Sequence, residues 1–321
     1  AAPPFTPYMP ETLNGRPLLV AITGDGAGGE TSAALVTAQI VATEPDLFLY
    51  LGDVYDEGTY AEFYNWYGTP DRFFGQFRDI TNPIIGNHEY GSGDGSGYFR
   101  YWNDIPHYYS YDAGGWHFVA LDSTSEYGQR RPGTPQIDWL RGDLAANADK
   151  CIIAYFHHPI FSVGPQGDTD SLIGIWQLLA EYSVEMMFAG HDHSYQRWRP
   201  LDAEGMPSPD GMTQFVVGSG GHGIQPFTRR DDRMAVGFDD PGHAIGTLYL
   251  ELNPKGANYR YVNVAGRIFD QGVLPCTGAE PDTEPPTTPE ALTASNDANG
   301  FVTLTWQPAY DDTGVASYTV Y

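Results

Sequence analysis

Lysine is nearly absent from this chain of 321 residues, which contains only Lys150 and Lys255. Lys and Arg together number 16 against 41 Asp and Glu, so the formal net charge at pH 7 is −25. Such a surface repels phosphate backbones, which argues against a nucleic-acid partner. The sequence also lacks any apolar run of the roughly 20 residues that a transmembrane helix needs, so we expect no membrane span.

Cysteine is scarce as well, because Cys151 and Cys276 are the only two and cannot support a disulfide-dense scaffold. In an oxidising compartment they could form one disulfide between an apolar run and the end of the main domain. The alternative is a buried free thiol at Cys151 and an unpaired Cys276, and we favour the disulfide. Residues 1–5 begin without Met, as after removal of a signal peptide, so we expect a secreted protein; a trimmed chain would begin in the same way.

Composition divides the chain into four parts. Residues 1–16 are rich in Pro and predict an extended arm, and residues 17–275 predict one large catalytic domain. Residues 276–289 predict a Pro/Thr-rich linker. Residues 290–321 follow, with strands expected at 291–295, 301–306 and 316–321.

Short apolar runs alternate with amphipathic stretches in the large domain. The runs at 17–23, 46–51, 116–121, 151–156 and 187–189 predict buried strands, and helices are expected at about 30–43, 134–146 and 170–182. This rhythm is typical of an α/β domain that places its ligands at the carboxyl ends of its strands. Further strands at about 213–218, 245–252 and 258–264 predict a second sheet packed on the first.

Five polar clusters follow the ends of predicted strands. They are Gly24-Asp25, Gly52-Asp53, Gly86-Asn87-His88-Glu89, His157-His158-Pro159 and Gly190-His191-Asp192-His193. Carboxylate, amide and imidazole groups are common ligands of zinc, iron and similar metals. Together they suit two cations roughly 3.5–4 Å apart that share one carboxylate, an arrangement used in phosphoryl transfer.

These five ordered motifs resemble those of the calcineurin-like metallophosphoesterases, and of their secreted purple-acid-phosphatase-like branch in particular, over about residues 17–275. The resemblance implies an α/β fold with a two-sheet β-sandwich flanked by helices. It implies a first metal ligated by Asp25, Asp53 and His193, and a second ligated by Asp53, Asn87, His157 and His191. It further implies that a metal-bridging hydroxide attacks phosphorus, while His88 steadies or protonates the leaving oxygen.

Two positions depart from the family pattern. Many members place a His two residues after the first Asp, where this chain has Ala27. Purple acid phosphatases instead place an iron-binding Tyr three residues after the bridging Asp, but here Tyr55 lies two residues after Asp53 and Asp56 lies three after it. We expect Asp56 to support His88, as the second Asp does in the Ser/Thr phosphatases. Tyr55 as a metal ligand is the alternative, so the metals (Fe, Zn or Mn) stay open.

Two further histidines are candidates for substrate contacts. His158 neighbours a predicted ligand and could touch phosphate or make an orienting hydrogen bond. His222 lies in the Gly-rich segment 218–223, which is expected to border the cleft.

The last residues carry a second resemblance. Trp306 follows alternating apolar and polar residues at 302–305, as in the opening strands of a fibronectin type III module. Because such a sandwich needs roughly 100 residues, we expect a truncated module.

We therefore expect a phosphatase that hydrolyses small phosphate monoesters. A phosphodiesterase or nucleotidase on the same site is the closest alternative. From another class, the chain could be a catalytically weak binding protein with a structural metal site, attached to polysaccharide or a cell surface through its C-terminal module. The Asn87-His88 pair argues against that reading.

Overall fold

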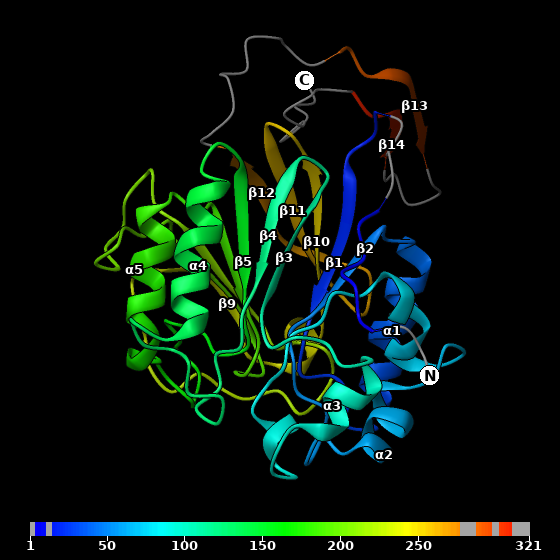
Figure 1. Ribbon diagram of the computed structural model, residues 1–321. Coiled ribbons are helices and arrows are strands. Elements are labelled where there is room, and N and C mark those ends of the chain that lie inside the picture. The colour runs from blue at the N-terminus through cyan, green and yellow to red at the C-terminus, as the bar shows by residue number, and fades with distance from the viewer. Residues whose placement is uncertain (1–3, 11–14, 277–286, 297–301, 310–321) are drawn as a thin grey trace.

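Two β-sheets face each other between helices in the computed structural model, which describes residues 4–10, 15–276, 287–296 and 302–309 (Figure 1). The first sheet consists, in spatial order, of β12 (Ile268–Pro275), β11 (Gly256–Asn263), β10 (Gly246–Asn253), β1 (Leu18–Thr23) and β2 (Leu47–Tyr50). The second consists of β3 (Tyr109–Ala113), β4 (Trp116–Ala120), β5 (Cys151–Tyr155), β6 (Met186–Ala189), β8 (Thr213–Val217), β7 (Tyr195–Trp198) and β9 (Met234–Phe238). The predicted fold class is thus confirmed.

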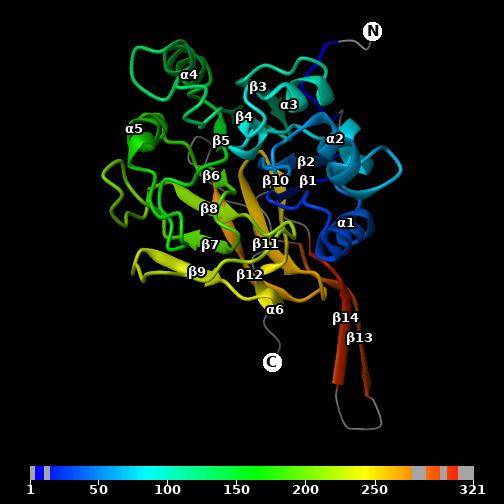
Figure 2. The same cartoon turned by 90° about the horizontal axis from the view of Figure 1, so that it is seen from below.

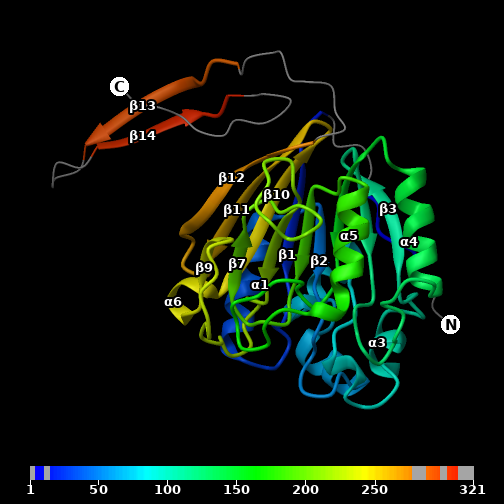
Figure 3. The ribbon, with the colours of Figure 1, turned by 90° about the vertical axis from the view of Figure 1, so that its left-hand side faces the viewer.

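The helices are α1 (Thr31–Thr43), α2 (Tyr60–Glu62), α3 (Ser96–Tyr101), α4 (Pro135–Ala146), α5 (Ile173–Glu181) and α6 (Pro241–Ala244). Helices α4 and α5 lie side by side along the second sheet (Figure 3). Helix α1 packs on the first sheet, where Gln39 Nε2 donates to the carbonyl oxygen of Asn263 at 2.6 Å. Among the described residues, no helix combines the length and apolar character that crossing a membrane requires.

Side chains of β5 point alternately to two faces of the sheet, and both faces are buried, so the sequence of this strand is apolar throughout. Ile153 belongs to the core between the sheets, together with Val20 of β1 and Leu250 of β10. Its neighbour Ile152 belongs to a second core, which includes Trp176 of α5. Because successive side chains of a strand point to opposite faces, a strand buried on both sides needs an unbroken apolar run.

The division of strands between the sheets differs from our prediction. We expected the strands after residue 213 to form a sheet of their own, and this was wrong. Strand β8 pairs in parallel with β6, placing Phe215 beside Phe188. Strand β10 pairs antiparallel with β1, placing Leu250 beside Val20. Apolar periodicity reports how deeply a strand is buried, but it does not report which strand is its hydrogen-bonding partner.

Parallel pairing brings the carboxyl ends of the central strands to one end of the molecule. Strands β1 and β2 are parallel, as are β4, β5, β6 and β8. The segment 82–85 runs beside β2, with the amide of Ile84 donating to Tyr50 at 3.1 Å. Helices α2 and α3 lie at the same end, which is seen from below in Figure 2. Four of the predicted clusters follow ends of these strands, and Gly86-Asn87-His88-Glu89 follows the extended segment 82–85 beside β2.

The two cysteines form the predicted disulfide. Cys151 begins β5 of the second sheet, and Cys276 directly follows β12 of the first, 125 residues later. Both side chains are buried. A crosslink over so long a loop limits the conformations open to the unfolded chain and so stabilises the fold.

Two of the three strands predicted within residues 290–321 are confirmed. They are β13 (Glu290–Asn296) and β14 (Val302–Gln307), which pair antiparallel in a sheet of their own. The expected strand at 316–321 and most of the linker at 276–289 lie outside the described residues. The fibronectin-like module therefore stays a prediction, as do the domain boundaries.

His117 on β4 supplies a pH-dependent tie between sheet and helix. Its Nδ1 lies 2.7 Å from Asp112 Oδ1 and its Nε2 lies 2.9 Å from Asp143 Oδ2. Burial disfavours the imidazolium, but hydrogen bonds to Asp143 and Asp112 outweigh it and raise the pKa of His117. Its stabilising contribution is thus complete below the unfolded pKa of about 6.5 and is lost as pH rises through the folded pKa.

We predict that His117→Gln lowers the free energy of unfolding more at about pH 6 than at about pH 9. Urea unfolding of wild type and variant at both pH values measures this difference. His243→Gln, at an exposed ion pair with Asp240, is the matched control and should have little effect. An equal loss for His117→Gln at both pH values would contradict a charged His117.

Candidate metal centre

Three of the predicted ligands have an unusual backbone conformation. The φ angles are +58° at Asp25, +65° at Asp53 and +70° at His191, all in the left-handed region. Residues other than glycine rarely adopt it, and it costs of order 1–3 kcal/mol where it is strained. Such residues cluster at functional sites, where the surrounding structure enforces them.

Glycines give the two aspartates room. A Cβ on Gly86 would lie 2.2 Å from Asp53 Oδ1, and a Cβ on Gly190 would lie 2.3 Å from Asp25 Oδ2. Both carboxylates are almost completely buried. Gly86 and Gly190, which begin two of the polar clusters, therefore allow close approach of neighbouring strand ends.

Two histidines are oriented by backbone carbonyl groups. His157 Nδ1 donates to Leu51 O at 2.7 Å, and His193 Nδ1 donates to Gly223 O at 2.9 Å. A hydrogen bond at Nδ1 fixes the tautomer and ring direction, and it leaves Nε2 as the free ligand atom. Histidines that bind metals in proteins are commonly held in this way.

One group of ligand atoms converges on Asp53 from β5 and β6. His157 Nε2 lies 3.2 Å from Asp53 Oδ2 and 3.1 Å from Asn87 Oδ1. Ligand atoms of Asp53, His157 and His191 all lie within 4.8 Å of one another. These four residues are the ones predicted for the second metal.

A second group of ligand atoms also meets Asp53, and it includes Tyr55. The Tyr55 hydroxyl lies 3.0 Å from Asp25 Oδ1, 2.9 Å from His193 Nε2 and 3.3 Å from Asp53 Oδ2. His193 Nε2 lies 3.6 Å from Asp25 Oδ1. Tyr55, which we considered from the sequence only as an alternative metal ligand, therefore lies among the residues predicted for the first metal.

The contact of Asp56 with His88 differs from the one we expected. His88 Nδ1 donates to the backbone carbonyl oxygen of Asp56 at 2.6 Å, so this carbonyl group, rather than the carboxylate, orients the ring. Asp56 is exposed, and its backbone amide donates to the Glu62 carboxylate at 2.8 Å. Any residue at position 56 could supply the same carbonyl oxygen.

Glu89 is a site residue that the sequence named only as part of a motif. Its carboxylate accepts the amide hydrogens of Gly86 at 2.6 Å, Val54 at 2.7 Å and Asp53 at 3.1 Å. It thereby joins the loop after β2 to the loop that carries Asn87. Its place within Gly-Asn-His-Glu was the available signal, but the contacts cross the chain and could not be read from spacing.

The electrostatics of the site favour bound cations. Burial and the neighbouring carboxylates raise the pKa of Tyr55 well above its usual value. Burial and Asp53 likewise raise the pKa of Glu89 to about 8. Although burial opposes the imidazolium, Asp53 raises the pKa of His157 to about 10. Without a metal, the His157 imidazolium is the positive charge that faces these carboxylates. Bound metal ions would displace its proton and offset the negative charge of the clustered oxygen donors.

The remaining predicted residues border these two groups. His88 is about a third exposed, with Nε2 at 4.0 Å from Asp53 Oδ2. His158 lies 4.4 Å from His191 between ring centroids, and its Nδ1 lies 2.9 Å from Ser123 Oγ. Burial holds the pKa of His158 well below its usual value, so the ring is neutral. His222 stacks on the ring of Tyr55.

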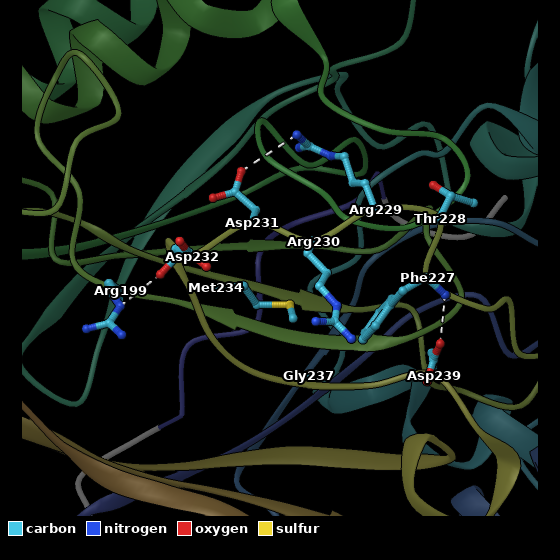
Figure 4. A pocket seen from close by; sticks show the side chains of 10 residues that line it. All are labelled: Arg199, Phe227, Thr228, Arg229, Arg230, Asp231, Asp232, Met234, Gly237 and Asp239. Carbon is cyan, nitrogen blue, oxygen red and sulfur yellow. Dashed lines mark hydrogen bonds and ion pairs between the residues drawn. The ribbon is translucent and has the colours of Figure 1, made fainter.

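A separate pocket of about 810 Å³ lies between Arg199 and the segment 227–239 (Figure 4). None of the predicted ligands lines it. Arg229 lies 3.6 Å from Asp231, and Arg199 Nε donates to the carbonyl oxygen of Asp232 at 3.1 Å. Its lining includes Arg and Asp side chains, and it is distinct from the metal centre.

Comparison with known proteins agrees with this geometry. The family model described as calcineurin-like phosphoesterase matches residues 18–195. The chain belongs to this family. It is 26% identical over 278 residues to purple acid phosphatase 15 of Arabidopsis thaliana, covering 73% of this chain and 48% of that protein. It is 25% identical over 174 residues to tartrate-resistant acid phosphatase type 5 of Mus musculus, covering 49% of this chain and 50% of that protein.

A solved structure of the same fold is purple acid phosphatase PPD1 from yellow lupin seeds. The TM-score is 0.66 at 19% identity, with 87% of this chain and 58% of that chain covered. The chain spans about half the length of the curated relatives it matches.

We predict that Gly86→Ala disrupts the metal centre, because the added Cβ meets Asp53 Oδ1 at 2.2 Å. Metal content by elemental analysis should fall from about two ions per chain to one or none. Gly142→Ala is the control, since a Cβ there meets no atom within 4 Å. Full metal content in Gly86→Ala would contradict the close packing around Asp53.

Proposed function

We propose that the chain is a metal-dependent phosphatase that hydrolyses small phosphate monoesters at the centre around Asp53. The observation that carries this proposal is the contact of the Asp53 carboxylate with two groups of ligand atoms. Asp25, Tyr55 and His193 form one group and Asn87, His157 and His191 the other. The two groups meet at Asp53 Oδ2, which lies 3.3 Å from the Tyr55 hydroxyl and 3.2 Å from His157 Nε2. We assign each group to one cation, with Asp53 shared between them.

When bound, two such cations neutralise the charge of the transferred phosphoryl group and lower the pKa of a bound water. The chain contributes a rigid frame. Leu51 and Gly223 carbonyl groups orient His157 and His193, and Glu89 holds the loops that carry Asp53 and Asn87. Because these groups are already ordered, little reorganisation is needed as charge develops in the transition state.

His88 is the residue we assign to the leaving group. The Asp56 carbonyl oxygen holds Nδ1, so Nε2 is the atom that can donate a hydrogen bond or a proton to the departing oxygen. Its exposed position beside Asp53 suits contact with a substrate. His158 is held by Ser123 on the other side of the site and can donate through Nε2 to a phosphate oxygen.

We favour a monoester as substrate, with His88 facing the departing oxygen and His158 facing an unesterified phosphate oxygen. The curated relatives, which are acid phosphatases, favour the same assignment. A phosphodiesterase or nucleotidase would use the same ligands and differ in the surrounding loops. The disulfide between Cys151 and Cys276 supports placement in an oxidising compartment, and hence secretion.

We predict that His88→Ala lowers kcat for an aryl phosphate monoester by roughly 10²–10⁴-fold while both metals stay bound. Turnover and elemental analysis of the same sample measure the two effects separately. His243→Ala, which removes an exposed His paired with Asp240, should leave both unchanged. Wild-type turnover in His88→Ala would remove His88 from the mechanism, and no turnover in wild type would favour a binding role.

A further inference from the structure

Tyr55 reaches the candidate ligand set from an unexpected sequence position, so the contacts that hold its ring matter. The ring is buried, with 3% of the residue exposed. One face is covered by His222, at 3.7 Å between centroids and 13° between ring planes. His88 packs edge-on at 4.5 Å. The hydroxyl is thereby directed at Asp25 and His193.

His222 is itself held at two points. Its amide donates to the carbonyl oxygen of Asp25 at 2.9 Å, which ties the loop after β8 to the first ligand. Its Nδ1 is paired with the carboxylate of Glu30, the residue that directly precedes α1. Gly28 makes room for this pair, since a Cβ there would lie 2.6 Å from both His222 Nδ1 and Glu30 Oε2.

We propose that Glu30 and His222 form a clamp that positions Tyr55 as a ligand of the first metal. This inference rests on the proposed function, because it concerns the metal centre assigned there. Both are positioning residues: His222 acts through the Tyr55 ring, and Glu30 acts through His222. The clamp gives the phenol a fixed direction, so a tyrosine two residues after Asp53 can lie beside Asp25 and His193.

A positioning role accounts for the contacts of His222 better than the substrate contact considered from the sequence. One ring face rests on Tyr55 and Nδ1 is taken by Glu30, so the side chain is only 27% exposed. His193 packs against the same ring at 5.3 Å. Within the described residues, the imidazole thus contacts Tyr55, His193 and Glu30.

The chain also contains a matched pair outside the site. His107 stacks on Tyr127 at 3.8 Å and 10°, and its Nδ1 lies 2.8 Å from Asp122 Oδ2. This trio of His, Tyr and carboxylate repeats the clamp, but Tyr127 is not among the candidate ligands. Removing His107 therefore removes the same kind of stack without touching the metal centre.

The test is titration of the metal-free protein with Fe(III), which gives a visible absorption band when a phenolate oxygen binds it. We predict that wild type shows this band and that Tyr55→Phe lacks it. His222→Ala should weaken Fe(III) affinity by roughly 10–100-fold and shift or weaken the band. His222→Phe keeps a stacking ring but loses the bond to Glu30, so it should restore the band only in part, whereas His107→Ala should behave as wild type.

Unchanged Fe(III) affinity and an unchanged absorption band in His222→Ala would overturn the clamp. An equal loss of Fe(III) affinity in His107→Ala would overturn it as well. Absence of the band in wild type would overturn the role of Tyr55, and the clamp with it. Turnover of an aryl phosphate by the same wild-type sample tests the proposed function separately. Turnover without the band would therefore refute the clamp and leave the phosphatase proposal standing.

Discussion

Two carboxylates buried at the end of the sheets are the constraint on which the rest of the site depends. Asp25 and Asp53 are at most 1% exposed, and both adopt positive φ. A buried carboxylate without compensation is costly, so the surroundings must supply hydrogen bonds and positive charge. Amide hydrogens supply part of this: His191 N donates to Asp25 and His88 N donates to Asp53. Bound cations supply the rest in our account.

The fold is arranged to impose that constraint. Parallel strands from two different sheets end at the same place, so groups far apart in the chain meet around Asp53. Glycines at 86 and 190 let the backbones approach, and the positive φ angles turn the side chains inward. Backbone carbonyl groups then orient His157 and His193. The disulfide between Cys151 and Cys276 joins the two sheets at the end of the molecule away from the metal centre. It helps to hold the two sheets together.

Much of this could be predicted from the sequence, because strand-end position and residue type are local properties. The ordered clusters placed Asp25, Asp53, Asn87 and the three histidines together, and the structure brings them together. Tyr55 was judged by its spacing from Asp53, but a long side chain can reach the same point from a neighbouring position. Asp56 was expected to use its carboxylate, whereas the backbone supplies the contact.

Contacts between distant segments could not be predicted. Glu89 joins two loops through amide hydrogens, and such bonds leave no residue pattern. Glu30 and His222 are 192 residues apart, and no periodicity links them. The partition of strands between the sheets was missed for the same reason, since burial does not identify a pairing partner.

The most direct test of the central claim is hydrolysis of an aryl phosphate monoester and of the matching diester by one wild-type sample of measured metal content. Our account predicts two metal ions per chain, faster turnover of the monoester, loss of turnover on chelation and recovery when metal is restored. Faster turnover of the diester would reassign the enzyme as a phosphodiesterase. Two bound metals with no turnover of either ester would contradict the account.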